Sequence, residues 1–259
     1  MKHERILAVV IACIGATLAN QSALASVISI NDTDSANFGS GPVGYDTGYL
    51  APNPNSSTVG VNVYIGGDTF TSSNRSYDFS STGQFNAWCV DIYHWMLPSY
   101  TYTVGTTSDL AAMLAPLRSN ATERVQQLIQ LADEVYGSLS SRTDSAAFQL
   151  AVWEIAYGTP ENSGIYQIDS TDPGFMVGSN TAGAAITEAN GWLSNLNTAA
   201  ATGHYKLTFL NDGTLEDTQD VVVFTPSIAT HDSQTVPEPT SIALLGLGLA
   251  SLFGTRRKA

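Results

Sequence analysis

Cysteine is nearly absent from this 259-residue chain, which contains only Cys13 and Cys89. Cys13 lies in an N-terminal segment that we expect to be removed on export, so the mature protein would keep a single cysteine. A single cysteine excludes an intramolecular disulfide. An isolated thiol in an oxidising compartment marks Cys89 as a candidate functional residue.

Basic residues and histidine are also scarce. The chain has 10 Lys and Arg against 23 Asp and Glu, and residues 26–236 carry 5 basic and 21 acidic residues, a net charge of −16. Such a surface repels nucleic acid and anionic lipid, so we expect neither as a partner. One cysteine and few histidines in the mature chain do not make up the usual ligand set of a transition metal, so we expect no metal and no cofactor.

The N-terminal 25 residues have the three zones of a secretory signal peptide. Lys2 and Arg5 form a basic start, an apolar stretch covers 6–19, and Ala23-Leu24-Ala25 supplies the small residues, Ala23 and Ala25, that a signal peptidase reads. We therefore expect residues 1–25 to be removed and the mature chain to begin at Ser26. The alternative, a lipoprotein cleavage box ending at Cys13, would leave a very short apolar region before the cut.

The C-terminal segment 237–259 combines three features in a fixed order. Pro237-Glu238-Pro239 precedes an apolar run of 12 residues, 242–253, and a basic end follows at 256–258. A helix needs roughly 20 residues to cross the hydrocarbon core, so this short transmembrane helix would be a marginal anchor with its basic end in the cytoplasm. A plain membrane anchor accounts for the apolar run and the charges but not for the Pro-Glu-Pro triplet.

This tail resembles the PEP-CTERM sorting signal. The resemblance implies processing by an exosortase, a membrane protease-transpeptidase, in a Gram-negative bacterium that makes exopolysaccharide. It implies a protein of the outer surface or extracellular matrix that is anchored in the inner membrane only before processing.

Between the two ends the pattern predicts an α+β fold: a β-rich body with a helical insert of about three helices, in a single ectodomain of residues 26–225. A linker, 226–236, leads to the tail. We expect strands at 27–30, 59–65 (ended by Gly66-Gly67-Asp68), 85–95, 100–104, 205–210 and 221–224. We expect clear helices at 122–136, 146–157 and 182–196, and a short helix at 110–117. Asn120 or Thr122 would cap the start of helix 122–136, and residues 143–145 would cap the start of helix 146–157.

Two apolar blocks each surround a polar residue. The first contains Trp88-Cys89-Val90, and the second contains Phe148-Gln149-Leu150-Ala151-Val152-Trp153. These blocks resemble those of the bacterial thioester domain family of surface adhesins. The resemblance implies an internal thioester between Cys89 and Gln149, with Trp88 and Trp153 packed around the bond, and it extends more weakly to Thr218-Gln219-Asp220.

A thioester is an activated acyl group that an amine or hydroxyl of a partner can attack once, which is attachment and not enzyme turnover. The sequence therefore predicts an exported binding protein with an adhesive role, whose partners are surface-protein amines or exopolysaccharide. The alternative is a non-covalent structural protein of the exopolysaccharide layer, in which Cys89 and Gln149 only pack.

Two other kinds of site are less favoured by the sequence. A Cys–His protease would pair Cys89 with His94, His204 or His231, but a continuous strand puts His94 on the opposite face from Cys89. An acidic stretch at 211–220 could attract calcium, but its spacing differs from that of an EF-hand loop, and a hairpin turn accounts for it more simply.

The processing prediction can be checked on protein recovered from its native host. N-terminal sequencing should give Ser26, and mass spectrometry should find no peptide from 242–253, because both ends carry processing signals. Surface-released protein that still contains 242–253 would instead support a plain membrane anchor.

Overall fold

A computed structural model describes residues 27–35, 65–72, 79, 83–161, 164–170, 172, 174–177, 183–196, 202–213 and 217–227. The segments expected to form the signal peptide and the sorting tail lie outside these residues. The chain divides into two units, Met1–Thr225 and Pro226–Ala259. Among the helices that the structure describes, none has the length and apolarity needed to cross a membrane.

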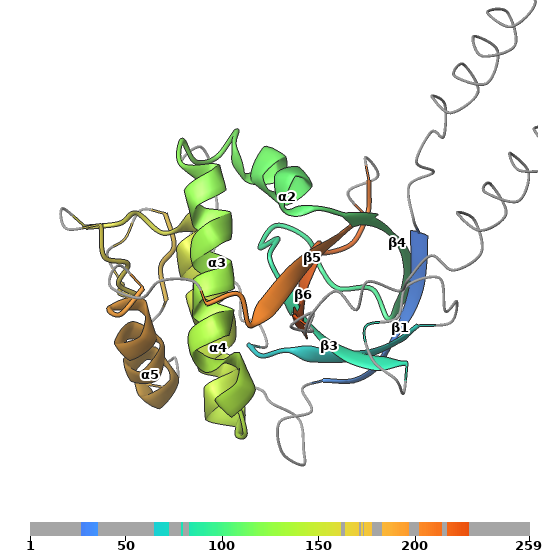
Figure 1. Ribbon diagram of the computed structural model, residues 1–259, viewed down its shortest axis with the longest axis horizontal. Coiled ribbons are helices and arrows are strands. Elements are labelled where there is room, and N and C mark those ends of the chain that lie inside the picture. The colour runs from blue at the N-terminus through green and yellow to red at the C-terminus, as the bar shows by residue number, and fades with distance from the viewer. Residues whose placement is uncertain are drawn as a thin grey trace, which may run out of the picture. The chain divides into compact units, whose positions relative to one another are not determined.

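The β-rich body is a closed antiparallel barrel with the strand order β1-β2-β3-β6-β5-β4 (Figure 1). Its strands are β1 (Val27–Ser35), β2 (Asp68–Ser72), β3 (Gln84–Cys89), β4 (Ser99–Gly105), β5 (Tyr205–Asn211) and β6 (Val221–Pro226). The first three strands follow one another around the barrel, and β6 closes it by lying between β3 and β5. Closure leaves these strands without an open sheet edge.

All described α-helices lie in the connection between β4 and β5. They are α2 (Thr107–Leu114), α3 (Ala121–Val135), α4 (Arg142–Tyr157) and α5 (Gly183–Leu193), with a short 3₁₀ turn at Tyr136–Ser138. In Figure 1, α3 and α4 stand between the barrel and α5. The expected α+β class with a helical insert is thereby confirmed, and the short segment near 110–117 is a full helix that Thr106 and Asp109 cap.

The helix starts differ from the expected ones because of capping. Helix α4 begins one turn before 146, since the Ser141 side chain accepts a hydrogen bond from the Asp144 backbone N–H and the Asp144 carboxylate binds back to the Ser141 N–H. Asn120 does occupy the N-cap position of α3, but its side-chain oxygen accepts from Arg124 Nε at 2.7 Å instead of capping the helix.

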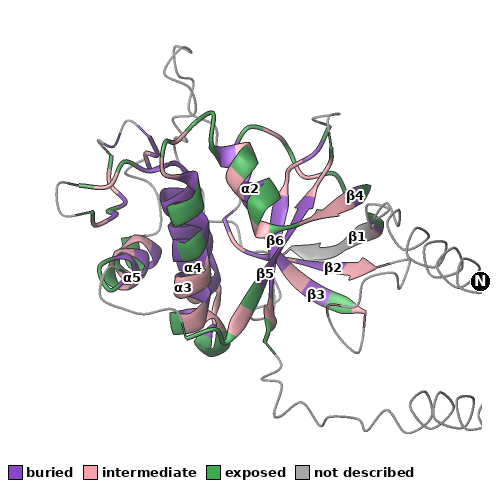
Figure 2. Cartoon of the chain, turned by 45° about the horizontal axis from the view of Figure 1, so that its top comes forward, coloured by how far each residue is buried: buried purple, intermediate pink, exposed green. Residues whose placement is uncertain are grey.

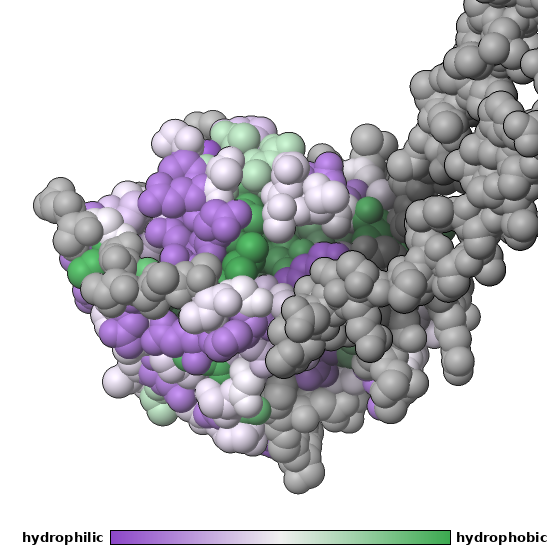
Figure 3. Space-filling view, viewed as in Figure 1, coloured by the Kyte–Doolittle hydropathy of each residue, from purple (hydrophilic) through white to green (hydrophobic). Residues whose placement is uncertain are grey.

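Helix α4 is buried continuously from Ser145 to Tyr157. It packs against α5 and also against strand β3, so both sides of the helix are covered. Figure 2 shows buried residues along the helices beside the barrel, and in Figure 3 hydrophilic residues gather over the outer surface of the helical part. This burial explains why apolar residues occur on every face of α4, whereas a surface helix has one apolar face and one polar face.

Buried Arg124 joins helix α3 to the end of helix α4. Its guanidinium donates to the carbonyl oxygens of Ile155, at 2.6 Å, and Gly158, at 2.9 Å, and lies over the ring of Tyr166. A cation at the last carbonyls of a helix satisfies acceptors that have no partner within the helix and complements its dipole.

One strand prediction is wrong in its bounds. The strand expected at 85–95 ends at Cys89, because the Asp91 side chain accepts a hydrogen bond from the Tyr93 N–H and turns the chain away from the sheet. Gly66 and Gly67 directly precede strand β2, which begins at Asp68. A Cβ atom on Gly67 would lie 2.8 Å from the Trp88 ring, so the glycine lets the Trp88 ring pack directly against the main chain at residue 67. Most of the expected strand 59–65 lies outside the described residues.

One carboxyl group is buried inside this core. Glu154 of helix α4 is 0% exposed, and neither of its oxygens has a hydrogen-bond partner within the described part of the chain. Its pKa is raised to about 9, mainly by desolvation and also by the carboxylate of Asp172, while the Arg124 guanidinium opposes the shift. Glu154 is therefore protonated in the folded protein at neutral pH.

Replacing Glu154 with Gln should change how stability depends on pH. The unfolded carboxyl ionises near its ordinary pKa of 4.5, whereas the folded one stays protonated up to about 9. The wild-type protein should therefore lose stability relative to Glu154→Gln as pH rises across this window, by about 1.4 kcal/mol per pH unit. Urea unfolding at pH 5, 6, 7 and 8 measures the difference. The exposed Glu123→Gln on α3 is the control for losing a carboxyl group. Parallel curves for wild type and Glu154→Gln would contradict the assignment.

Candidate functional site

The candidate cysteine lies at one rim of the barrel. Cys89 is the last residue of β3 and pairs with Val221, the first residue of the antiparallel strand β6. The three residues Thr218, Gln219 and Asp220 directly precede β6. They therefore reach the same rim where the chain leaves β3. Cys89 is buried there, with 8% of its surface exposed.

Gln149 of helix α4 clamps the main chain of Cys89. The Cys89 N–H donates to Gln149 Oε1 at 3.0 Å, and Gln149 Nε2 donates to the Cys89 carbonyl at 2.8 Å. Pairing of β3 with β2 ends at Ala87, opposite Asp68, so the Gln149 amide takes the place that a neighbouring strand would have beside Cys89. The fully buried Gln149 is satisfied in this way, as a buried amide must be.

Gln219 contacts the thiol itself. The Cys89 Sγ atom donates to Gln219 Oε1 at 3.0 Å. The Gln219 side chain also donates from Nε2 to the Asp91 carbonyl at 2.8 Å, and its backbone N–H donates to the Trp95 carbonyl at 3.2 Å. The loop after β3 thus holds both the main chain and the side chain of Gln219 and fixes its amide against the sulfur.

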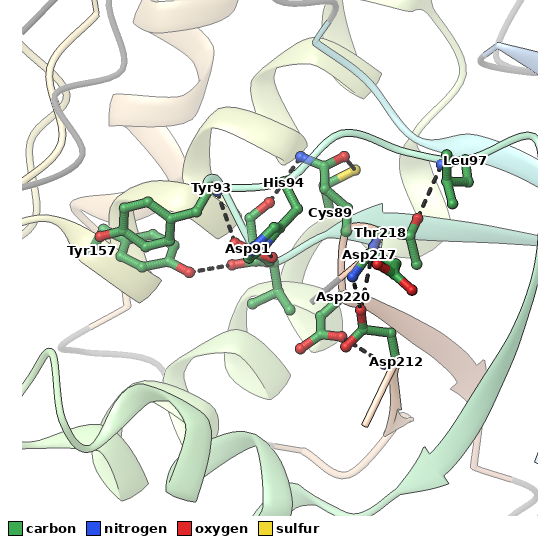
Figure 4. Close-up of polar contacts among 12 residues, drawn as sticks. Cys89, Asp91, Tyr93, His94, Leu97, Tyr157, Asp212, Asp217, Thr218 and Asp220 are labelled. Carbon is green, nitrogen blue, oxygen red and sulfur yellow. Dashed lines mark hydrogen bonds and ion pairs between the residues drawn. The ribbon is translucent and has the colours of Figure 1, made fainter. Parts of the chain in front are cut away.

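The residues around Gln219 lock its position further. Thr218 Oγ1 accepts from the Leu97 N–H at 3.0 Å. The hydroxyl of Tyr102, on β4, donates to the Gln219 carbonyl at 2.9 Å. Burial raises the pKa of Tyr102, and the hydrogen bond with Thr218 partly opposes the rise, so the hydroxyl keeps its proton and remains a donor. Figure 4 shows this cluster around Cys89.

The two tryptophans that the sequence assigned to the surroundings of the bond are both buried. The Trp88 ring packs edge-on against Phe148, with centroids 4.6 Å apart, and against Tyr136 at 6.1 Å. The Trp153 ring contacts Phe175, with centroids 6.1 Å apart. They belong to the packing between the barrel, helix α4 and the segment that follows it, and this packing positions Gln149 under Cys89.

Carboxylates gather at the same rim. Asp91 accepts hydrogen bonds from the Tyr93 N–H and from His94 Nδ1. Burial raises the pKa of Asp220 to about 7; the carboxylates of Asp212 and Asp91 raise it too, and a hydrogen bond from the Asp212 N–H lowers it. Neutral and charged forms of Asp220 therefore coexist near pH 7.

The strand that would have put His94 on the opposite face from Cys89 does not extend to residue 94. The strand ends at Cys89, so alternation no longer applies at residue 94, and the intervening loop returns to the Gln219 segment that contacts the thiol. The other histidines considered are elsewhere: His204 directly precedes β5, and His231 lies outside the described residues.

The acidic stretch around Asp212 forms a backbone turn. Asp212 Oδ2 accepts hydrogen bonds from the N–H groups of Asp217, at 2.7 Å, and Thr218, at 3.2 Å. Over the residues that the structure describes, no group of three or more His, Cys, Asp or Glu side chains is placed to hold a metal ion.

The sorting residues Pro237, Glu238 and Pro239 lie outside the described residues, but a comparison of sequences covers them. Residues 235–258 match the PEP-CTERM protein-sorting motif. The chain thus carries the signal of an exported protein that is transiently anchored in the membrane, and the motif implies processing by an exosortase.

Two solved structures are similar to this chain. One is the N-terminal thioester domain of the fibronectin-binding protein SfbI from Streptococcus pyogenes, 13% identical, with a TM-score of 0.39 over 73% of this chain and 98% of that one. The other is the N-terminal domain of the S. pyogenes pilus tip adhesin Cpa, 10% identical, with a TM-score of 0.41 over 76% of this chain and 98% of that one. No curated protein matches the chain. The case for a reactive bond here therefore rests on the contacts of Cys89.

Replacing Gln149 with Met should destabilise the protein, because the side chain keeps its length but leaves the buried N–H and C=O of Cys89 without partners. Each such group costs roughly 1–3 kcal/mol, so we expect a loss of about 2–4 kcal/mol in urea unfolding. Gln126→Met, at an exposed position of α3, is the matched control and should change stability by less than about 0.5 kcal/mol. Equal stability of the two variants would contradict the clamp.

Proposed function

We propose that this exported protein forms an internal thioester between Cys89 Sγ and the side-chain carbonyl carbon of Gln219. The bond would attach the protein once, covalently, to an amine or hydroxyl of a partner. The observation that supports this proposal most directly is the 3.0 Å contact between buried Cys89 Sγ and Oε1 of the half-buried Gln219.

The chemistry balances with the groups present. The Cys89 sulfur attacks the Gln219 carbonyl carbon, the C–N bond of the amide breaks, and the nitrogen leaves as ammonia with the thiol proton. A partner amine or hydroxyl later attacks the same carbon, the C–S bond breaks, and sulfur takes up the proton that the nucleophile loses. The product is an amide or ester at Gln219 and a restored thiol at Cys89.

Gln219 replaces Gln149 in this proposal for a geometric reason. Both polar atoms of the Gln149 amide bind the main chain of Cys89, which is a positioning role. The Gln219 amide instead presents its oxygen to the sulfur. The resemblance in sequence included Thr218-Gln219-Asp220, so the signal for the second glutamine is present in the chain.

The surroundings favour survival of such a bond. An activated acyl group persists only where water is kept away. On the sulfur side Cys89 and Trp88 are 8% and 0% exposed, and on the acyl side Gln219 is half-buried. The main-chain clamp on Cys89 and the bonds that hold Gln219 also orient the reacting atoms in advance.

The export signal sets the biological context of this proposal. We place the mature protein at the outer surface or in the extracellular matrix of a Gram-negative bacterium, where its partners would be surface-protein amines or exopolysaccharide hydroxyls. Each molecule would react once, so the protein acts in attachment and adhesion and is not an enzyme.

Mass spectrometry of freshly exported, amine-free protein tests the bond. Because ammonia is lost, the mass should be about 17 Da below that of the processed sequence. Methylamine should add to Gln219 and expose the Cys89 thiol together. Cys89→Ala and Gln219→Ala should both abolish the deficit, whereas folded Gln149→Ala protein should keep the capacity to form it.

Two results would decide against this assignment. A deficit lost in Gln149→Ala but kept in Gln219→Ala would return the bond to Gln149. A full-mass wild-type protein with a freely titrating thiol would exclude the thioester altogether. The non-covalent structural protein of the exopolysaccharide layer would then be the better account.

A further inference from the structure

We propose that His94, oriented by Asp91, is the general base that activates the nucleophile attacking the Cys89–Gln219 acyl group. This inference rests on the proposed thioester and adds a catalytic residue to it. His94 is carried by the loop of residues 91–95, which connects directly to Cys89 and turns back over Gln219.

The loop holds Gln219 on both sides of His94. Three residues before the histidine, the Asp91 carbonyl accepts from Gln219 Nε2 at 2.8 Å. One residue after it, the Trp95 carbonyl accepts from the Gln219 N–H at 3.2 Å. The main chain that carries His94 is therefore held to Gln219 on both sides of the histidine.

Asp91 also fixes the state of the imidazole ring. Its carboxylate oxygen Oδ2 pairs with His94 Nδ1, and the Asp91 and His94 side chains are 10% and 32% exposed, respectively. A buried carboxylate that binds Nδ1–H favours the tautomer with the lone pair on Nε2, and it stabilises the imidazolium that forms when Nε2 takes a proton. The partial exposure of His94 lets a nucleophile from solvent reach the ring.

The proton transfer completes the chemistry of attachment. As the nucleophile attacks the Gln219 carbonyl carbon, its proton moves to His94 Nε2. When the C–S bond breaks, the imidazolium returns that proton to the Cys89 sulfur, which leaves as the thiol. The histidine ends the reaction neutral, and no further reactant is needed.

Two carboxyl groups interact with His94 itself: Asp91 on its own loop and Asp220 from the segment before β6. Tyr93, next to it on the loop, interacts with Tyr157 of α4 and with Arg118, and Asp212 interacts with Asp220. Asp220 interacts electrostatically with His94 and has a raised pKa of about 7, so it is the other group that could produce a pH dependence in the neutral range.

The experiment follows opening of the thioester in the exported full chain, by water and by transfer to glycerol. Attack by hydroxide rises about tenfold per pH unit without levelling off, and glycerol does not ionise between pH 5 and 8, so a rise of the rate that levels off in this range comes from a titrating group of the protein. The variants are His94→Asn, which keeps a donor for Asp91 but has no basic nitrogen, His94→Ala, and Asp220→Asn as the matched control.

We expect wild type and all three variants to form the bond with its mass deficit. The wild-type rate should rise as an imidazole loses its proton and then level off, and the Asp220→Asn variant should keep this rise. His94→Asn and His94→Ala should lack it and react about 100-fold more slowly at pH 8. Added imidazole should partly restore His94→Ala.

The experiment distinguishes failure of the base assignment from failure of the thioester. His94→Asn reacting within a few-fold of wild type, with the same pH profile, would overturn the base assignment while leaving the thioester intact. Loss of the pH-dependent rise in Asp220→Asn alone would assign it to Asp220. A bond that fails to form in His94→Ala but forms and reacts normally in His94→Asn would reduce His94 to a structural partner of Asp91. A wild-type protein without the mass deficit would overturn the proposed function and this inference together.

Discussion

The paired hydrogen bonds between the Gln149 amide and the main chain of Cys89 are the contact on which the arrangement of this rim depends. They attach the last residue of a barrel strand to the centre of a helix that is buried on all sides. Strand β2 does not extend beside Cys89, so without Gln149 two buried backbone groups would have no partner. With Gln149 in place, the strand can end at Cys89 and the chain can turn immediately into the loop that holds Gln219.

The barrel and the helical layer together hold Cys89 in place at this rim. The barrel supplies the antiparallel pairing of β3 with β6, which brings Cys89 and the residues before Val221 together. The helical layer supplies the clamp and the aromatic packing of Trp88 against Phe148. Neither layer alone would hold both the main chain and the side chain of Cys89. The acidic groups at the rim, one with a pKa near 7, add a local charge that varies with pH around a buried sulfur atom.

Much of the fold was accessible from the sequence because local patterns determine it. Short runs rich in β-branched and aromatic residues located β1, β4, β5 and β6, the apolar block around Gln149 indicated a buried helix, and the family resemblance paired that residue with Cys89. The end of β3 was not accessible, because it depends on hydrogen bonds that the Asp91 carboxylate accepts from Tyr93 and His94, and the periodicity of the sequence does not reveal them. The contact between Gln219 and the thiol depends on the register of two strands far apart in sequence, so the triplet Thr218-Gln219-Asp220 alone could not rank it above Gln149. Nothing in the apolar sequence of α4 separates protonated Glu154 from an exposed carboxylate.

The separation of the three central residues along the chain has a consequence for biogenesis. Cys89 meets Gln149 across 60 residues and Gln219 across 130 residues, and the whole helical layer is made between the first and the last of them. A chain that crosses a membrane unfolded, N-terminus first, delivers its thiol long before either glutamine. The Cys89 thiol therefore remains accessible to solvent until β6 closes the barrel and the helices pack against it. Masking of the thiol thus marks the last step of assembly, and a truncated or stalled chain is distinguished from a finished one by an accessible cysteine.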